Sequence, residues 1–180
     1  MNPLIDKTWH LANTEEETKL TDFEFHLWRV FYGFMRWQEG CEKVANQTDL
    51  TGSELSILHI IRMKDRPKTL NELMRLLNRD DNFNITYSLK KLIKNGFIKK
   101  IASDKNNKKT FSYEITKQGI KNTDAYTALR KNVLIELFAK KRELNLDKLS
   151  SALSELIALY EEADRTVLSY MGSSNPSIKK

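Results

Sequence analysis

Hydrophobic residues recur at spacings of three and four along most of the chain, a pattern that predicts a largely helical protein. Three of these stretches begin with Thr-x-x-Glu, the signature of a capping box in which a threonine and a glutamate satisfy free amides at a helix start. The predicted boxes are Thr21/Glu24, Thr51/Glu54 and Thr69/Glu72. The first helix should bury an aromatic stripe at positions Phe23, Leu27, Val30, Phe31, Phe34 and Trp37.

The next two predicted helices differ in how much of their surface is apolar. The helix from Gly52 to about Met63 is apolar on most sides, as expected of a core helix enclosed by others. Pro67 interrupts the pattern because proline disfavours a helical conformation at the residue before it. A short helix with one apolar face then follows from Thr69.

A fourth helix is expected at about 82–95, after a turn-rich stretch. At about 100° per residue, Leu89, Leu92 and Ile93 fall within about 80° of Ile85, which predicts one buried face. Gly96 should end this helix as its C-terminal cap.

A β-hairpin is predicted immediately after this helix. Residues 97–101 and 111–115 read as strands, and the second alternates apolar and polar side chains. The segment Ser103–Lys109 between them is basic and turn-forming, so the hairpin should have a charged tip.

The rest of the chain predicts two more helices, from about Lys117 to Lys141 and from Leu146 onward. The last helix keeps alternating three-four spacing, which is typical of a helix that packs on another helix. This seam comprises Leu146, Leu149, Leu153, Leu156, Tyr160, Ala163 and Val167. Residues 172–180 are small and polar and predict a flexible tail.

Composition places the chain among globular proteins, because 40% of its 180 residues are hydrophobic and 30% are charged. The single cysteine, Cys41, excludes an internal disulfide, and no apolar run approaches the roughly 18 residues of a membrane span. A cytoplasmic protein without a membrane segment is therefore expected. His10, His26 and His59 lack metal-ligand spacing, so we expect no metal, no cofactor and no catalytic site, and hence no enzyme.

The formal net charge of +6 is concentrated in one region. Residues 82–117 hold nine lysines against two acids, a local net charge of +7. Residues 142–170 hold six acids against three bases, a net charge of −3. Only the first of these regions suits a polyanionic partner.

The order helix, helix, basic helix and basic hairpin is that of a winged helix-turn-helix, in which one helix enters the DNA major groove. A lysine-rich helix face by itself could be merely solvated, but the basic hairpin that follows favours nucleic-acid binding. The side chains expected to contact DNA are Asn84, Tyr87, Lys90, Lys91 and Lys94 on the helix and Lys105, Lys108 and Lys109 on the hairpin.

These residues resemble the MarR (multiple-antibiotic-resistance regulator) family of winged-helix transcription regulators. The resemblance is densest in Leu50-Thr-x-x-Glu54-Leu-x-x-Leu58, Leu89-x-x-Leu92-x-x-x-Gly96-Phe-Ile-Lys, Asp104-Lys and Thr116-x-x-Gly119. The sequence departs from the family at Asn106, where an arginine commonly enters the minor groove, and in an extra N-terminal arm.

The resemblance implies a mainly α fold with a small β-hairpin wing (α+β), in which a winged helix-turn-helix lobe sits on a helical dimerisation base. The implied parts are an N-terminal arm (1–20), a first dimerisation helix (21–48), the DNA-binding lobe (49–116), the C-terminal dimerisation helices (117–171) and the tail. The side chains expected at the dimer contact are Phe23, Leu27, Leu149, Leu153, Leu156 and Tyr160.

The function expected from this resemblance is a homodimeric regulator, a repressor, that binds pseudo-palindromic double-stranded DNA. The family also implies a pocket for a small aromatic or anionic effector, for which Trp9, Trp28 and Trp37 are candidates, although core packing explains these residues equally well. Cys41 lies too late in its helix to match the family's oxidant-sensing cysteine and is interpreted as a buried small hydrophobe. The alternative is a winged-helix module that binds an acidic protein, or nucleic acid without sequence preference.

Overall fold

The computed structural model describes residues 10–104, 107–141 and 144–172, and within them no side chain at 103–110 or 172. The chain divides into two compact units, and the boundary between them in the sequence lies between Val133 and Leu134. The elements of the first unit are α1 (Glu15–Asn46), α2 (Gly52–Arg62), the 3₁₀ turn η1 (Met63–Asp65), β1 (Lys68–Thr69), α3 (Leu70–Leu77), α4 (Asn82–Lys94), β2 (Ile98–Asp104), β3 (Asn107–Ile115) and α5 (Lys117–Arg130). The π-helical turn η2 (Lys131–Ile135) crosses the boundary, and α6 (Glu136–Lys140) and α7 (Leu146–Gly172) form the second unit.

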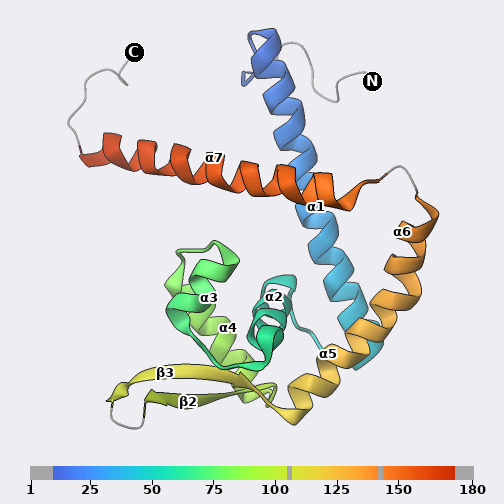
Figure 1. Cartoon of the computed structure of the whole chain (residues 1–180), viewed down its shortest axis with the longest axis vertical. Coiled ribbons are helices and arrows are strands. Elements are labelled where there is room, and N and C mark those ends of the chain that lie inside the picture. Colours follow the sequence, from blue (N-terminus) through green and yellow to red (C-terminus); the bar gives the residue numbers. More distant parts are fainter. Residues whose placement is uncertain (1–9, 105–106, 142–143, 173–180) are drawn as a thin grey trace. The chain divides into compact units, whose positions relative to one another are not determined.

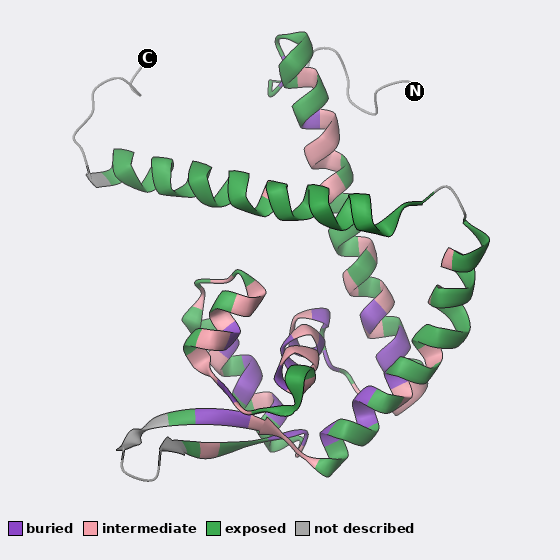
Figure 2. Cartoon of the chain, in the orientation of Figure 1, coloured by how far each residue is buried: buried purple, intermediate pink, exposed green. Residues whose placement is uncertain are grey.

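The core of the first unit lies among α2, α3, α4 and the sheet (Figures 1 and 2). Helix α2 is central because it is apolar on most sides, and Leu55, Ile57 and Leu58 have no exposed surface. Leu73 of α3 and Ile85 of α4 are likewise fully enclosed. The sequence-based prediction of α2 as the core helix is confirmed.

The sheet has three antiparallel strands in the order β1, β3, β2. The β2–β3 hairpin was predicted, but both strands continue into the segment expected as a loop, and β3 begins at Asn107. Strand β1 was missed because two residues, Lys68 and Thr69, are too few to display an alternation. It pairs with β3, where Lys68 lies opposite Tyr113.

Helices α1 and α5 pack together through a buried carboxylate. Glu42 is fully buried on α1 and accepts hydrogen bonds from the side chains of Thr48, Asn46 and Asn122. These donors come from α1, from the loop after it and from α5. A buried charge needs such partners, so Glu42 joins the two helices at the end where α1 leads into α2.

The start of α1 corrects one sequence-based prediction. The helix begins at Glu15, and its capping box is Thr14 with Glu17. The predicted box at Thr21/Glu24 is wrong, because the Thr21 hydroxyl lies within the helix and donates to the carbonyl oxygens of Leu11 and Glu17. Residues 15–20, expected in the N-terminal arm, therefore belong to the helix.

Of the other two predicted capping boxes, one is complete and the other is half formed. Thr51 and Glu54 form the complete reciprocal box. At α3, Thr69 accepts from the Glu72 amide, whereas the Glu72 side chain turns away to Arg66.

The second unit consists of helices with largely exposed surfaces. The helix predicted from Lys117 to Lys141 exists, but η2 interrupts it. The helix predicted from Leu146 is confirmed as α7, along which described side chains are exposed or half-buried in the single chain (Figure 2). In the described part of the chain, no helix is long and apolar enough to cross a membrane.

Candidate nucleic-acid interface

Helix α4 has a buried face and an exposed face that lie opposite each other. Ile85, Leu89 and Leu92 are buried in the core, as predicted. At about 100° per residue, the positions about 140–200° away from Ile85 form a spine along the outer surface. This outer spine consists of Phe83, Tyr87, Lys90 and Lys94, all of which are exposed.

Two sequence-based expectations for α4 need adjustment. Ile93 was assigned to the buried stripe but is 36% exposed, because it lies at the edge of that stripe. Phe83 was not identified as a site residue, yet it is 82% exposed on the outer spine. The signal was present in the sequence, since a phenylalanine two residues before Ile85 falls on the face opposite the core.

A chain of polar contacts holds the first turn of α4. The Arg79 guanidinium pairs with Asp81 and also donates to the Ser53 hydroxyl of α2 at 2.6 Å. Asn84 donates from Nδ2 to Asp81 at 3.0 Å. Hydrogen bonds from Arg79 and Asn84 lower the pKa of Asp81 to about 2, so this carboxylate stays ionised at any physiological pH. The contacts orient Asn84, a predicted DNA-binding residue, at the exposed helix start.

Lys91 differs from the other lysines of α4. Its Nζ donates to the Glu54 carboxylate at 2.8 Å and to the Asp49 carbonyl at 3.2 Å. Glu54 is itself buried and caps α2. Lys91, predicted to bind DNA, is thereby held against α2, whereas Lys90 and Lys94 are exposed.

The wing carries lysines whose described contacts are within the hairpin. Lys99 pairs with Glu114 across the strands at 2.8 Å, and the Lys100 ammonium lies 3.8 Å from the centroid of the Phe111 ring. Lys105 and Asn106 lie outside the described residues. For Lys108 and Lys109 the structure describes only the backbone, which belongs to β3.

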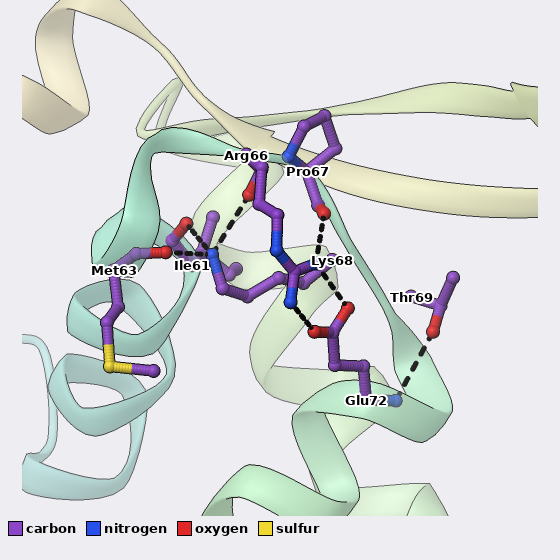
Figure 3. A network of polar contacts seen from close by, with 7 residues as sticks. All are labelled: Ile61, Met63, Arg66, Pro67, Lys68, Thr69 and Glu72. Atoms are coloured by element: carbon purple, nitrogen blue, oxygen red, sulfur yellow. Dashed lines mark hydrogen bonds and ion pairs between the residues drawn. The ribbon is translucent and has the colours of Figure 1, made fainter.

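A buried lysine anchors the edge of the sheet that carries the wing (Figure 3). Lys68 has no exposed surface, and its Nζ donates to the carbonyl oxygens of Ile61 and Arg66, each at 2.9 Å, and of Met63. These carbonyls belong to the end of α2 and the turn after it. Lys68 therefore ties α2 to β1, and through β1 to β3.

The neighbouring ion pair holds the same turn from outside. Arg66 binds the Glu72 carboxylate of α3 with both terminal nitrogens (Figure 3). This interaction lowers the pKa of Glu72. Sequence reasoning did not identify Lys68 or Arg66, because neither belongs to a periodic pattern.

The residues predicted at a dimer contact lie on two helices. Phe23 and Leu27 are half-buried on α1. On α7, Leu149, Leu153 and Tyr160 are exposed in the single chain, and Leu156 is half-buried. Cys41 is buried, as predicted.

The family model described as "Winged helix DNA-binding domain" matches residues 50–119, the segment that contains α2, α3, α4 and the wing. No curated protein matches this chain.

Solved structures share the fold over most of the chain. AbfR of Staphylococcus epidermidis is 20% identical, with a TM-score of 0.62 over 84% of this chain and 97% of its own. A MarR/EmrR family transcriptional regulator from Acinetobacter sp. ADP1 is 13% identical, with a TM-score of 0.66 over 79% and 96%. FabT of Streptococcus pneumoniae, solved in complex with DNA, is 14% identical, with a TM-score of 0.59 over 82% and 99%. The chain thus contains a winged helix DNA-binding domain, and its fold is the one seen in these regulators, which include a MarR/EmrR family member.

Proposed function

We propose that this protein is a homodimeric transcription regulator, a repressor, which binds pseudo-palindromic double-stranded DNA through α4 and the β2–β3 wing. The observation that carries the proposal is the outer spine of α4, which presents two aromatic rings and two lysines opposite a fully buried face. A helix of this kind in a winged helix domain enters the major groove, with its N-terminal residues at the base edges. Solved structures of AbfR and FabT contain DNA, which supports the same role.

Exposed apolar surface on two helices supports the homodimer. Val30 and Phe31 of α1, which were predicted to be buried, are more than half exposed in the single chain, as is Trp28. On α7, Leu149 and Leu153 are 46% and 51% exposed. Apolar surface of this extent on a globular protein marks an interaction site. A two-fold dimer would present two equivalent α4 helices, so the DNA site should be a pseudo-palindrome with half-sites about 10 base pairs apart.

The helix and the wing should contribute differently to binding. Asn84 is held by Asp81 at the start of α4, where side chains reach the base edges. Lys105, Lys108 and Lys109, in the segment that the sequence predicts as the hairpin tip, should contact phosphates, because lysine supplies charge without reading sequence. Lys91 then serves to hold α4 on α2 through Glu54.

Relief of repression by a small ligand is part of the proposal. The surface of α1 carries the aromatic rings of Phe25, Trp28 and Tyr32 beside the guanidinium groups of Arg29 and Arg36. Rings and guanidinium groups suit an aromatic anion. Isothermal titration of aromatic carboxylates, with Arg36→Ala as the matched variant, tests this step.

The central test compares genomic fragments with random duplex DNA at several salt concentrations. A sequence-specific regulator should retain selected fragments at a salt concentration where random duplex dissociates. Lys108→Ala with Lys109→Ala should lower the salt slope by up to about two and weaken all sequences alike. Asn84→Ala should reduce the preference for the selected fragment. Equal retention of all duplexes would refute the specific regulator and favour a non-specific nucleic-acid binder.

A further inference from the structure

The outer spine of α4 contains more exposed aromatic surface than phosphate binding requires. Phe83 is 82% exposed and Tyr87 is 64% exposed, and Phe83 has the highest exposure among the large hydrophobic side chains of the described chain. The two residues are four apart, so their side chains lie one turn apart on the same face. Two neighbouring aromatic side chains kept in water form an apolar patch, and an exposed apolar patch marks a contact surface.

The aromatic and cationic groups of the spine occupy separate halves. Phe83 and Tyr87 lie in the first half of α4, and Lys90 and Lys94 lie in the second. In the major groove, the first half of a recognition helix reaches the base edges, and cations farther along reach the phosphates. A partner that offers apolar groups beside a row of negative charges therefore matches the spine.

We propose that Phe83 and Tyr87 read thymine, by packing their rings on the C5-methyl groups of thymines in each half-site. The thymine methyl is the apolar group at the base edges of the DNA major groove, and phenylalanine is among the side chains that contact it. This inference rests on the proposed function and adds a base preference to it. Asn84, which is hydrogen-bonded to Asp81, would supply a polar contact to the DNA major groove beside the two rings.

The charge beside the rings favours DNA over a protein groove as the occupant. Asp81, the acid at the start of α4, is paired with Arg79, and Lys90 and Lys94 continue the same face. A duplex supplies phosphates and methyl groups at the same time. An apolar protein groove satisfies the rings but leaves these lysines without an anion.

The test removes only the methyl groups from the DNA. A genomic fragment retained by the full-length protein is first trimmed to its footprint, and thymines are then replaced by uracil in both strands, one symmetric pair at a time. Uracil keeps the O4 acceptor of thymine, so any loss of affinity belongs to the methyl. Burying one methyl group contributes about 0.8 kcal/mol, or about fourfold in Kd, so a symmetric pair should weaken binding about fifteenfold.

Variants assign the effect to the two rings. In Phe83→Ala with Tyr87→Ala, the thymine and uracil duplexes should bind with nearly equal Kd, measured by fluorescence anisotropy at one salt concentration. Lys94→Ala is the matched control, and it should weaken both duplexes while keeping their ratio. The exposed positions should leave the fold intact, which circular dichroism checks.

Two failures can be told apart. If wild-type protein binds the trimmed fragment tightly but binds every uracil duplex equally well, the thymine contact is refuted and the regulator stands. If no genomic fragment stays bound at a salt concentration where random duplex dissociates, the proposed function is refuted, and the thymine contact is refuted with it.

Discussion

Replacing Lys68 by methionine should destabilise the DNA-binding lobe strongly. Methionine keeps much of the length and apolar volume of the side chain but removes the ammonium, whose three donors are used by the carbonyl oxygens of Ile61, Met63 and Arg66. A buried carbonyl left without a donor costs about 1–3 kcal/mol; this cost applies in full to Ile61, whose hydrogen bond is buried, and in part to Met63 and Arg66, whose bonds are partly buried. Burying the ammonium is itself unfavourable, and this desolvation lowers the pKa of Lys68. Because methionine carries no charge to desolvate, the substitution recovers part of the cost.

The expected net loss is about 3 kcal/mol in the free energy of unfolding, because hydrogen bonds from a charged donor contribute about 1.5–3 kcal/mol each before the desolvation of the ammonium is subtracted. For a chain of this size the melting temperature should fall by roughly 6–12 °C. Urea titration followed by circular dichroism at fixed protein concentration measures the difference. Lys64→Met, an exposed position in the same turn, is the control and should be nearly neutral. A Lys68→Met protein within 1 kcal/mol of wild type would refute the anchoring role.

Three further predictions concern the packing, the titration and the assembly of the chain. Gly119→Ala should cost about 1–3 kcal/mol, because a Cβ there would lie 2.1 Å from the carbonyl oxygen of Phe97; urea titration measures it. Burial lowers the pKa of His59, a cause that outweighs nearby charges, so the unfolded chain binds more protons than the folded one as pH falls through about 6.5. The free energy of unfolding should therefore decrease below pH 7, by up to about 1.4 kcal/mol per pH unit, in urea titrations at pH 7.5 and 5.5. Leu153→Asp with Leu156→Asp should dissociate the proposed homodimer, which light scattering detects, because it places unpaired charges on a helix seam.

Each of these predictions has a matched control. Gly40→Ala has no atom within 4 Å of the added Cβ and should stabilise its helix by about 0.5–1 kcal/mol. In His59→Gln the dependence of stability on pH should flatten, and an unchanged slope would contradict the assignment to His59. Ser151→Asp, on the polar side of α7, should leave the assembly intact. A folded dimer in the leucine double variant would contradict the α7 contact.

The sequence alone determined the elements whose signals are local. The start of α2 followed from Thr51 and Glu54, because a capping box involves neighbouring residues only. The buried face of α4 followed from the spacing of Ile85, Leu89 and Leu92, since helical periodicity fixes which side chains share a face. The same helical periodicity also predicts that Phe83 points outward, although Phe83 was not identified as a site residue from the sequence.

Only the tertiary structure decided the features that depend on polar contacts outside the periodic patterns. Lys91 has the same sequence surroundings as Lys90, yet it faces Glu54, 37 residues away, and so is held in an ion pair. Lys68 reads as an ordinary surface lysine until the carbonyls at the end of α2 surround it. Thr21 had the spacing of a helix start, but the backbone of Leu11 folds back on it and the helix begins earlier. In each case the partner of a polar group lies outside the helical repeat, at a separation of two to 37 residues, and such a partner leaves no periodic trace in the sequence.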